Sequence, residues 1–245
     1  MFFHGSTVDE YHEVNVEAMK ICERVYCVSR EACEAVREFY PEFADKIDYV
    51  ENYVDAKEVR EKAEEFVPKY PKDRLVLCTC GRITPDKGFD LAVQAAKLLR
   101  NNGLNFKWYF VGDGFDRSRI ESLILEKNLT EFVEITGLQT NPYPYIKNCD
   151  IYIQSSYDEA LSISMLEAQM LCAPMVSTKT AGGIAMIQDG VNGLLAEINA
   201  ESLAEAIKRL VNDNNLRKKI KKYLYKIDYS VEEKRYKRDW EELLR

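Results

Sequence analysis

Two glutamates stand in the apolar stretch "SSYDEALSISMLEAQ", residues 155–169. Glu159 lies just before a run of helical spacing, and Glu167 stands between Leu166 and Ala168 inside that run. A carboxylate without a partner in apolar surroundings is costly or changes its protonation state. We therefore expect a partner group or a ligand beside both acids.

The start of the helix that carries Glu167 suits an anion. Ser162 is the expected N-cap, so the N–H groups that follow Leu161, including that of Ile163, are free to point at a ligand. The helix dipole contributes only about 0.3–1 kcal/mol, so it assists cationic side chains rather than replacing them. Carboxylates beside an anion site should repel the anion unless they bind hydroxyl groups instead. A carboxylate can accept two hydrogen bonds from the vicinal diol of a sugar or ribose.

Two cations come from "GRITPDKGFD", residues 81–90, where Arg82 and Lys87 stand between Gly81 and Gly88. Charge-assisted hydrogen bonds contribute about 1.5–3 kcal/mol each, so this pair suits a diphosphate. The segment lacks the order of residues that makes a nucleotide P-loop. Taken alone, such cations are more often solvated, and isolated acids more often exposed or ion-paired on a helix edge. Their convergence on one edge of a sheet favours a binding site instead.

The elements that position these residues alternate between strands and helices from residue 75 onward. The expected strands cover residues 75–81, 106–112, 132–137, 151–156, 174–180 and 193–198. The expected helices cover residues 89–100, 117–128, 143–148, a run from 162, and 200–213, 217–227 and 230–245. This order predicts an α/β fold with a doubly wound parallel sheet and a helical C-terminal extension. Ligands of such sheets bind beyond the carboxyl ends of the strands.

Two further loops follow strands of this sheet. In "GDGFD", residues 112–116, we expect Gly112 and Gly114 to permit close backbone approach to a ligand. A lone Gly-x-Gly after the second strand does not indicate a nicotinamide dinucleotide site. The loop of residues 180–193 contains two consecutive glycines, and we expect it to form a flexible wall of the same crevice.

The first 70 residues have a different pattern. Residues 24–29 and 46–52 are expected strands with a helix at 30–40 between them, and residues 55–74 are charged and contain prolines, as a linker would. Two strands and a helix make a poor domain alone. We interpret this part as the end of a domain whose beginning is absent.

The composition of the 245 residues excludes several classes of function. A net charge of −7 argues against nucleic acid as a partner. The basic run Arg217–Lys222 could contact an anionic membrane surface, although a solvated helix face is the preferred interpretation. Seven scattered cysteines, and histidine only at His4 and His12, indicate reduced thiols, a cytoplasmic protein and no metal site.

Together these motifs resemble the donor-binding half of glycosyltransferase family 4, the retaining nucleotide-sugar transferases with two Rossmann-like domains (GT-B type). Glu159 and Glu167 match that family's two glutamates separated by seven residues. The stretches "GRITPDKGFD", "VGDGFDRSRIESLI" and "DGVNGLLAEINAESLAEAIKRLVND" follow its order. The resemblance runs from about residue 20 to 245, and "NPYPYIKN" is most similar to members that build surface polysaccharides.

The resemblance implies a role for each residue of the donor site. Arg82 and Lys87 hold the leaving diphosphate beside Gly81, Glu167 binds the ribose hydroxyls, and Glu159 contacts the donor sugar. Glu159, Arg82 and Lys87 count as the catalytic residues. Further contacts come from the backbone of Leu161, Ser162 and Ile163 at the phosphate and from Leu138 near the base. No cofactor or metal is implied, since fixed cations stabilise the leaving group.

The resemblance also implies a domain plan. Residues 1–70 are a remnant of the acceptor-side domain with its linker, 71–227 the nucleotide-sugar-binding domain, and 228–245 a helix that packs back on the N-terminal part. The function implied is transfer of a hexose-type sugar from a nucleoside diphosphate sugar to a sugar or lipid-linked acceptor, in the cytoplasm or at the inner face of the membrane. This chain alone is expected to be inactive because it lacks the acceptor domain.

Two departures from the family pattern stand in the donor loops. Ala160 replaces the usual glycine after the first glutamate, and Ala185-Met186 replaces Pro-Glu. Two alternatives stay open: a non-catalytic nucleotide-sugar-binding module that acts with a separate acceptor-domain chain, and a nucleotide-sugar epimerase.

Overall fold

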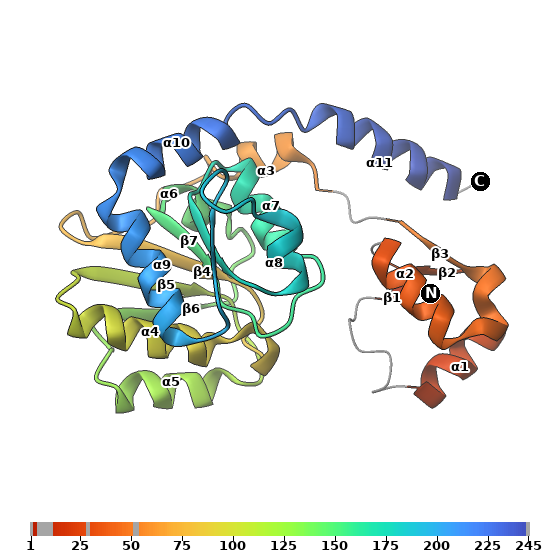
Figure 1. Cartoon of the computed structure of the whole chain (residues 1–245), viewed down its shortest axis with the longest axis horizontal. Coiled ribbons are helices and arrows are strands. Elements are labelled where there is room, and N and C mark those ends of the chain that lie inside the picture. Colours follow the sequence, from red (N-terminus) through yellow and green to blue (C-terminus); the bar gives the residue numbers. More distant parts are fainter. Residues whose placement is uncertain (1, 4–11, 28–29, 51–53, 244–245) are drawn as a thin grey trace. The chain divides into compact units, whose positions relative to one another are not determined.

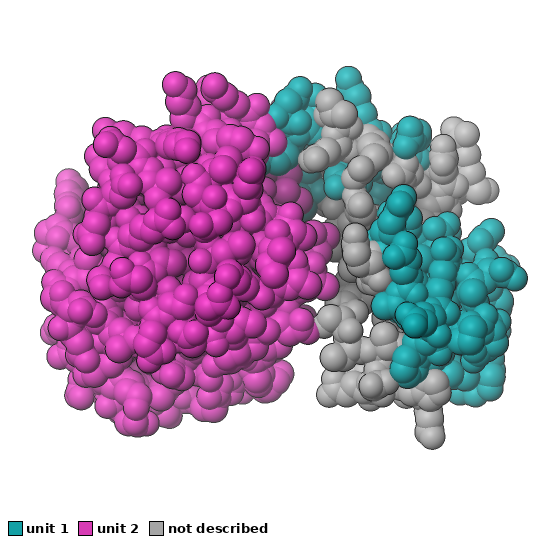
Figure 2. All heavy atoms as spheres, in the orientation of Figure 1, with its two compact units in different colours: residues 1–55, 228–245 teal, residues 56–227 magenta. Residues whose placement is uncertain are grey.

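The computed structural model describes residues 2–3, 12–27, 30–50 and 54–243. The chain divides into two compact units, Met1–Asp55 with Asp228–Arg245 and Ala56–Ile227, which Figure 2 draws in different colours. Within the described ranges, no helix has both the length and the apolar character needed to cross a bilayer.

The larger unit contains a six-stranded parallel sheet with the strand order β6-β5-β4-β7-β8-β9. Its strands are β4 (Leu75–Cys80), β5 (Phe106–Val111), β6 (Val133–Gly137), β7 (Ile151–Gln154), β8 (Met175–Thr178) and β9 (Leu194–Ala196). The chain runs outward from β4 through β5 to β6 and then returns to β7 on the other side of β4. The strand order therefore reverses between β4 and β7, where ligands of such sheets bind.

Helices cover both faces of this sheet (Figure 1). They are α3 (Ala56–Lys62), α4 (Phe89–Asn101), α5 (Arg117–Glu126), α6 (Tyr143–Asn148), α7 (Ile163–Met170), α8 (Ala181–Met186), α9 (Ala200–Asn212) and α10 (Asn214–Leu224), with a 3-10 turn η3 (Pro85–Lys87). Alternate strand residues enter different cores: Leu77 joins the core under α4, α5 and α9, whereas its neighbour Cys78 joins the core under α6 and α7. The prediction of a doubly wound α/β sheet is confirmed.

Helix α3 lies in the segment 55–74 that the sequence predicts to be a linker. Ala56, Val59 and Ala63 are buried along one side, and the charged residues between them face outward. Arg60 Nε also donates to Met170 O at 3.2 Å, which ties α3 to the end of α7. The sequence did not predict this helix, because the few apolar residues of the segment are too sparse to show a helical pattern among so many charges.

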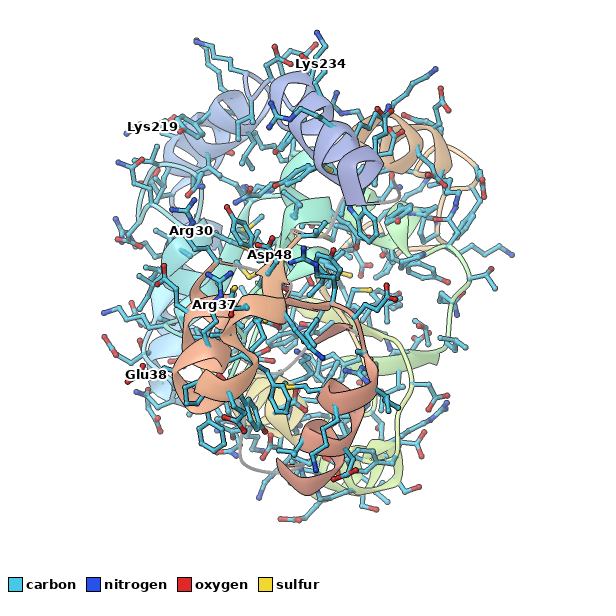
Figure 3. All side chains as sticks on the ribbon, turned by 90° about the vertical axis from the view of Figure 1, so that its right-hand side faces the viewer. Arg30, Arg37, Glu38, Asp48, Lys219 and Lys234 are labelled. Atoms are coloured by element: carbon cyan, nitrogen blue, oxygen red, sulfur yellow. The ribbon has the colours of Figure 1, made fainter. Side chains whose placement is uncertain are left out.

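The smaller unit holds a parallel three-stranded sheet of order β1-β2-β3. Its elements are β1 (Phe2–Phe3), α1 (His12–Ile21), β2 (Val25–Cys27), α2 (Arg30–Phe39), the 3-10 turn η2 (Pro41–Lys46), β3 (Ile47–Tyr49) and α11 (Ser230–Leu243). Arg37 of α2 donates from Nε to Ile47 O at 3.0 Å, and Figure 3 shows it with Arg30 on α2 and Asp48 on β3. The predicted strands and the helix between them are confirmed in the described residues; positions 28–29 and 51–52 of those strands lie outside them.

Candidate functional site

Gly88 brings the loop after β4 against the end of β7. It has a left-handed φ of 61°, and a Cβ there would lie 2.0 Å from Ser155 O. Ser155 Oγ in turn donates to Lys87 O at 3.2 Å. Only glycine permits this approach, which carries the Lys87 side chain to the carboxyl edge of β7.

Lys87 receives the first of the two glutamates. Its Nζ lies 2.9 Å from Glu159 Oε2, and the two side chains are only 21% and 10% exposed. Gln154 Nε2 donates to the same carboxylate oxygen at 3.1 Å. Glu159 is thus held by one cation and one amide in a largely dry position, where an ion pair is screened far less than at the surface.

Gln154 is a member of this network that the sequence analysis did not identify. Its Oε1 accepts from Tyr152 OH at 3.1 Å, and its Nε2 also donates to Ser156 Oγ at 2.8 Å. Tyr152 and Ser156 are fully buried, so both ends of the amide are fixed. The available signal was an amide side chain at the end of the apolar strand run "IYIQ".

Arg82 differs from Lys87 in having no internal partner. Its side chain is exposed, and it makes no hydrogen bond or ion pair with any residue that the structure describes. Gly81 next to it is open, since a Cβ added there would meet nothing within 4 Å. The β4 edge therefore presents a free guanidinium beside a glycine with open space at its Cβ position.

The two glycines of the loop after β5 pack against the protein itself. Gly112 has a φ of 148°, and a Cβ there would lie 1.9 Å from Gly81 O. A Cβ on Gly114 would lie 2.2 Å from Ile83 O. These glycines thus permit close approach to the backbone on either side of Arg82, and not to a ligand as we expected from the sequence.

Helix α7 begins as predicted at Ser162. Ser162 has an extended backbone, and its Oγ accepts from Met165 N at 3.3 Å, which confirms the N-cap. Beside it, Leu161 is half-buried and Ile163 is 42% exposed. The first turn of α7 therefore follows Glu159 with its N–H groups at the carboxyl edge of β7.

The first part of the loop after β8 forms helix α8, so this part is not the flexible segment that was predicted for residues 180–193. Thr180 caps α8 by accepting from Gly183 N at 3.1 Å, and Gly182 N donates to Glu159 O at 2.6 Å. Both glycines are buried, and a Cβ on Gly182 would lie 2.9 Å from Ala160 O. The consecutive glycines are explained by close packing of α8 against the loop that carries Glu159.

Glu167 has no cationic partner among the residues that the structure describes. Glu167 is half-buried, and the partial loss of solvent around its carboxyl raises its pKa from the ordinary 4.5 to about 7. Tyr143 OH donates to Oε1 at 3.0 Å, which lowers the pKa but does not outweigh burial. The charge of Glu167 also raises the pKa of Cys80, so this acid lies near the end of β4.

Leu138 follows β6 and is 80% exposed, at the same carboxyl edge of the sheet. The predicted residues thus all lie in or after the loops of that edge. We call Gly81, Arg82, Lys87, Glu159, Glu167 and the start of α7 at 161–163 the strand-end site. In the described part of the chain, no three His, Cys, Asp or Glu side chains are grouped to hold a metal ion.

Comparison with known proteins finds that this chain is similar to glycosyltransferases. The chain is 32% identical over 151 residues to the lipopolysaccharide core biosynthesis glycosyltransferase LpsE of Rhizobium meliloti, covering 61% of this chain and 43% of that protein. It is 29% identical over 178 residues to the N-acetylgalactosamine-N,N'-diacetylbacillosaminyl-diphospho-undecaprenol 4-alpha-N-acetylgalactosaminyltransferase of Campylobacter jejuni, covering 72% of this chain and 47% of that protein. The chain thus spans about half the length of these curated relatives.

A solved structure shows the same fold. The crystal structure of Alr3699/HepE from Anabaena, in complex with UDP and glucose, matches with a TM-score of 0.76 at 16% identity, over 98% of this chain and 70% of that one. The model of the family described as glycosyl transferases group 1 matches residues 60–227, the larger unit almost entire. The chain therefore belongs to the glycosyl transferases group 1.

Proposed function

We propose that this chain is the nucleotide-sugar-binding part of a retaining glycosyltransferase of family 4. The observation that carries the proposal is the strand-end site, where a free Arg82, a largely buried Lys87–Glu159 pair and the start of α7 meet at the point where the strand order reverses. Two cations and a helix N-terminus favour a diphosphate, and two acids favour hydroxyl groups.

Arg82 and Lys87 have different parts in this proposal. Arg82 is free to bind the diphosphate through two hydrogen bonds from its guanidinium group. Lys87 has three ammonium protons, so it can keep its bond to Glu159 and still donate to a phosphate oxygen. As the glycosidic bond breaks, negative charge grows on the diphosphate, and both cations stabilise it without moving.

The two acids and several further contacts complete the proposed donor-binding site. Glu159 accepts from hydroxyls of the donor sugar, and Glu167 accepts from the ribose diol. Neither has the role of an acid or a nucleophile in a glycosidase. The backbone at residues 161–163 donates to the diphosphate, Gly81 allows close approach, and Leu138 covers the base. No metal or cofactor is required in this scheme.

For the whole protein we propose transfer of a hexose-type sugar in polysaccharide or glycoconjugate biosynthesis. The smaller unit then belongs to the acceptor-side domain, with α11 returning to it. A lipid-linked acceptor agrees with the relative whose name includes diphospho-undecaprenol. This chain alone should bind the donor but transfer little, because catalysis needs both substrates held together.

A weak contact with the inner face of a membrane belongs to the same proposal. Lys218, Lys219, Lys221 and Lys222 are exposed on α10, and none has an ion-pair partner in the described part of the chain. Lys219 is labelled in Figure 3. Each such lysine adds about 1 kcal/mol near an anionic surface. Sedimentation with vesicles of anionic lipid, and its loss at high salt, tests this contact.

Calorimetric titration of the chain with UDP, GDP and ADP, without added metal and again with EDTA, tests the proposed function. We expect saturable binding of at least one nucleotide, unchanged by EDTA and several-fold weaker in Arg82→Ala. Arg217→Ala removes an equal charge from α10 and serves as the matched control. Failure of a folded chain to bind all three nucleotides contradicts the proposal.

A further inference from the structure

Glu167 depends on one side chain for its position. Tyr143 OH is the group that donates to its carboxyl, at 3.0 Å from Oε1, and no bond to Oε2 is recorded among the described residues. A carboxylate oxygen can accept two hydrogen bonds, so this arrangement leaves Oε2 and one lone pair of Oε1 for a ligand.

Tyr143 is itself held at the first turn of α6. Its backbone N–H donates to Asn141 Oδ1 at 3.2 Å, and Asn141 Nδ2 donates to Lys62 O and to Glu65 Oε2, both at 2.8 Å. The end of α3 therefore fixes the start of α6, and α6 presents the phenol to α7. A hydroxyl that is placed by this chain of bonds acts as a fixed donor.

Among the described residues, three titratable groups outside this pair interact with it: Cys80 and Tyr152, which are neutral near pH 7, and Glu58. Burial is the main cause that raises the pKa of Cys80 on β4, of Tyr143 on α6 and of Tyr152 on β7 above their ordinary values, and the charge of Glu167 adds to each shift. Glu58 on α3 brings a negative charge toward the Tyr143 phenol. No cation appears among the causes that shift Glu167, so its ionised form depends on the hydrogen bond from Tyr143.

We infer that Tyr143 is a positioning residue of the donor site: its hydroxyl holds Glu167 in the ionised, correctly turned form that accepts the ribose diol. The inference rests on the proposed function of Glu167. Its consequence is that affinity for a nucleotide follows the ionisation of one half-buried acid near neutral pH. A protonated Glu167 would offer a donor where the diol needs acceptors.

Calorimetric titration of UDP, GDP and ADP between pH 6 and pH 9 tests this inference in the wild-type chain and in two variants. Ionisation of Glu167 near pH 7 makes wild-type binding about tenfold weaker at pH 6 than at pH 8. Glu167→Gln cannot ionise, so it should bind weakly and retain only the shallow pH dependence of the nucleotide phosphate, whose pKa is about 6. Tyr143→Phe should move the wild-type midpoint upward by about half to one pH unit, with near-normal affinity at pH 9.

Tyr70→Phe is the matched control, because Tyr70 OH donates to Tyr145 O at 3.0 Å and has no contact with Glu167. The inference is overturned if the affinity of Tyr143→Phe depends on pH as in the wild type. It is also overturned if that affinity is lower by the same factor at every pH. If Glu167→Gln binds like the wild type, the proposed role of Glu167 fails instead.

Carbon-13 NMR titration of the Glu167 carboxyl decides the case without a ligand. The midpoint should be near 7 in the wild type and higher in Tyr143→Phe, while Tyr70→Phe leaves it in place. An unchanged midpoint in Tyr143→Phe overturns the inference even if no nucleotide binds.

Discussion

The two glutamates of the strand-end site, Glu159 and Glu167, stand eight positions apart but meet opposite surroundings. Glu159 is paired with a cation, Lys87, and accepts from Gln154. Glu167 has only a neutral phenol, and burial raises its pKa to about 7. One acid is thus held in a charged network across two loops, and the other is balanced between two protonation states.

This difference follows from where each acid lies. Glu159 is in a loop between β7 and α7, where Gly88 lets the loop after β4 deliver a lysine. Glu167 is on α7, beside Tyr143 of α6 and Cys80 of β4, and in the described part of the chain no cation shifts its pKa. A residue in a loop at the sheet edge can contact charged side chains from several neighbouring loops. A residue on a packed helix face contacts only the side chains of the element that faces it.

Gly88→Ala should have the largest effect, because it removes the contact that brings the cation to Glu159. The new Cβ would clash with Ser155 O at 2.0 Å in a left-handed conformation, so we expect a loss of about 3 kcal/mol or more in the free energy of unfolding. Urea denaturation measures the loss. Gly103 also has a positive φ, but the space around its Cβ position is open. Gly103→Ala should therefore lower the free energy of unfolding by only about 1 kcal/mol. Equal losses in both variants would contradict this account.

Glu167→Gln should raise stability at alkaline pH. The folded-state pKa of Glu167 lies above its ordinary value of 4.5, so ionisation costs stability as pH rises from about 4.5 to about 7, and the loss persists above that range. The shift corresponds to at most about 3 kcal/mol at pH 8. The free energy of unfolding of the variant should therefore rise relative to that of the wild type between pH 4.5 and pH 8. Urea denaturation at these two pH values measures the change. The exposed Glu201→Gln is the control. A constant difference between Glu167→Gln and the wild type at both pH values would disprove the raised pKa of Glu167.

The sequence predicts the sheet of the larger unit well and the partners of the acids poorly. Near-continuous apolar runs specify β4 and β5 because each strand is buried on both faces. The N-cap at Ser162 is also predicted, since it depends on residues three positions apart. The bonds from Lys87 and Tyr143 join residues 72 and 24 positions apart, and no local pattern encodes such pairs.

Lys87→Ala should cost about 1–2 kcal/mol of unfolding free energy, because it leaves the largely buried Glu159 without its cation. A double-mutant cycle with Glu159→Gln separates the pair from the rest of the network. We expect the double variant to be less unstable than the sum of the two single variants, as chemical denaturation at pH 7 can measure. Additive losses would show that Gln154, rather than Lys87, holds Glu159.

Ser162→Ala should have the smallest effect and bears on both acids, since Ser162 follows Glu159 and caps the helix of Glu167. Loss of the bond from Met165 N at 3.3 Å should cost about 1 kcal/mol, as for other N-caps. Thr180→Ala removes the matching N-cap of α8, where Thr180 Oγ1 accepts from Gly183 N at 3.1 Å. This change should cost a similar amount of unfolding free energy. If Ser162 also places the α7 N–H groups at a diphosphate, its variant should lose nucleotide affinity while Thr180→Ala retains it. Equal affinity in the two variants would restrict Ser162 to a structural role.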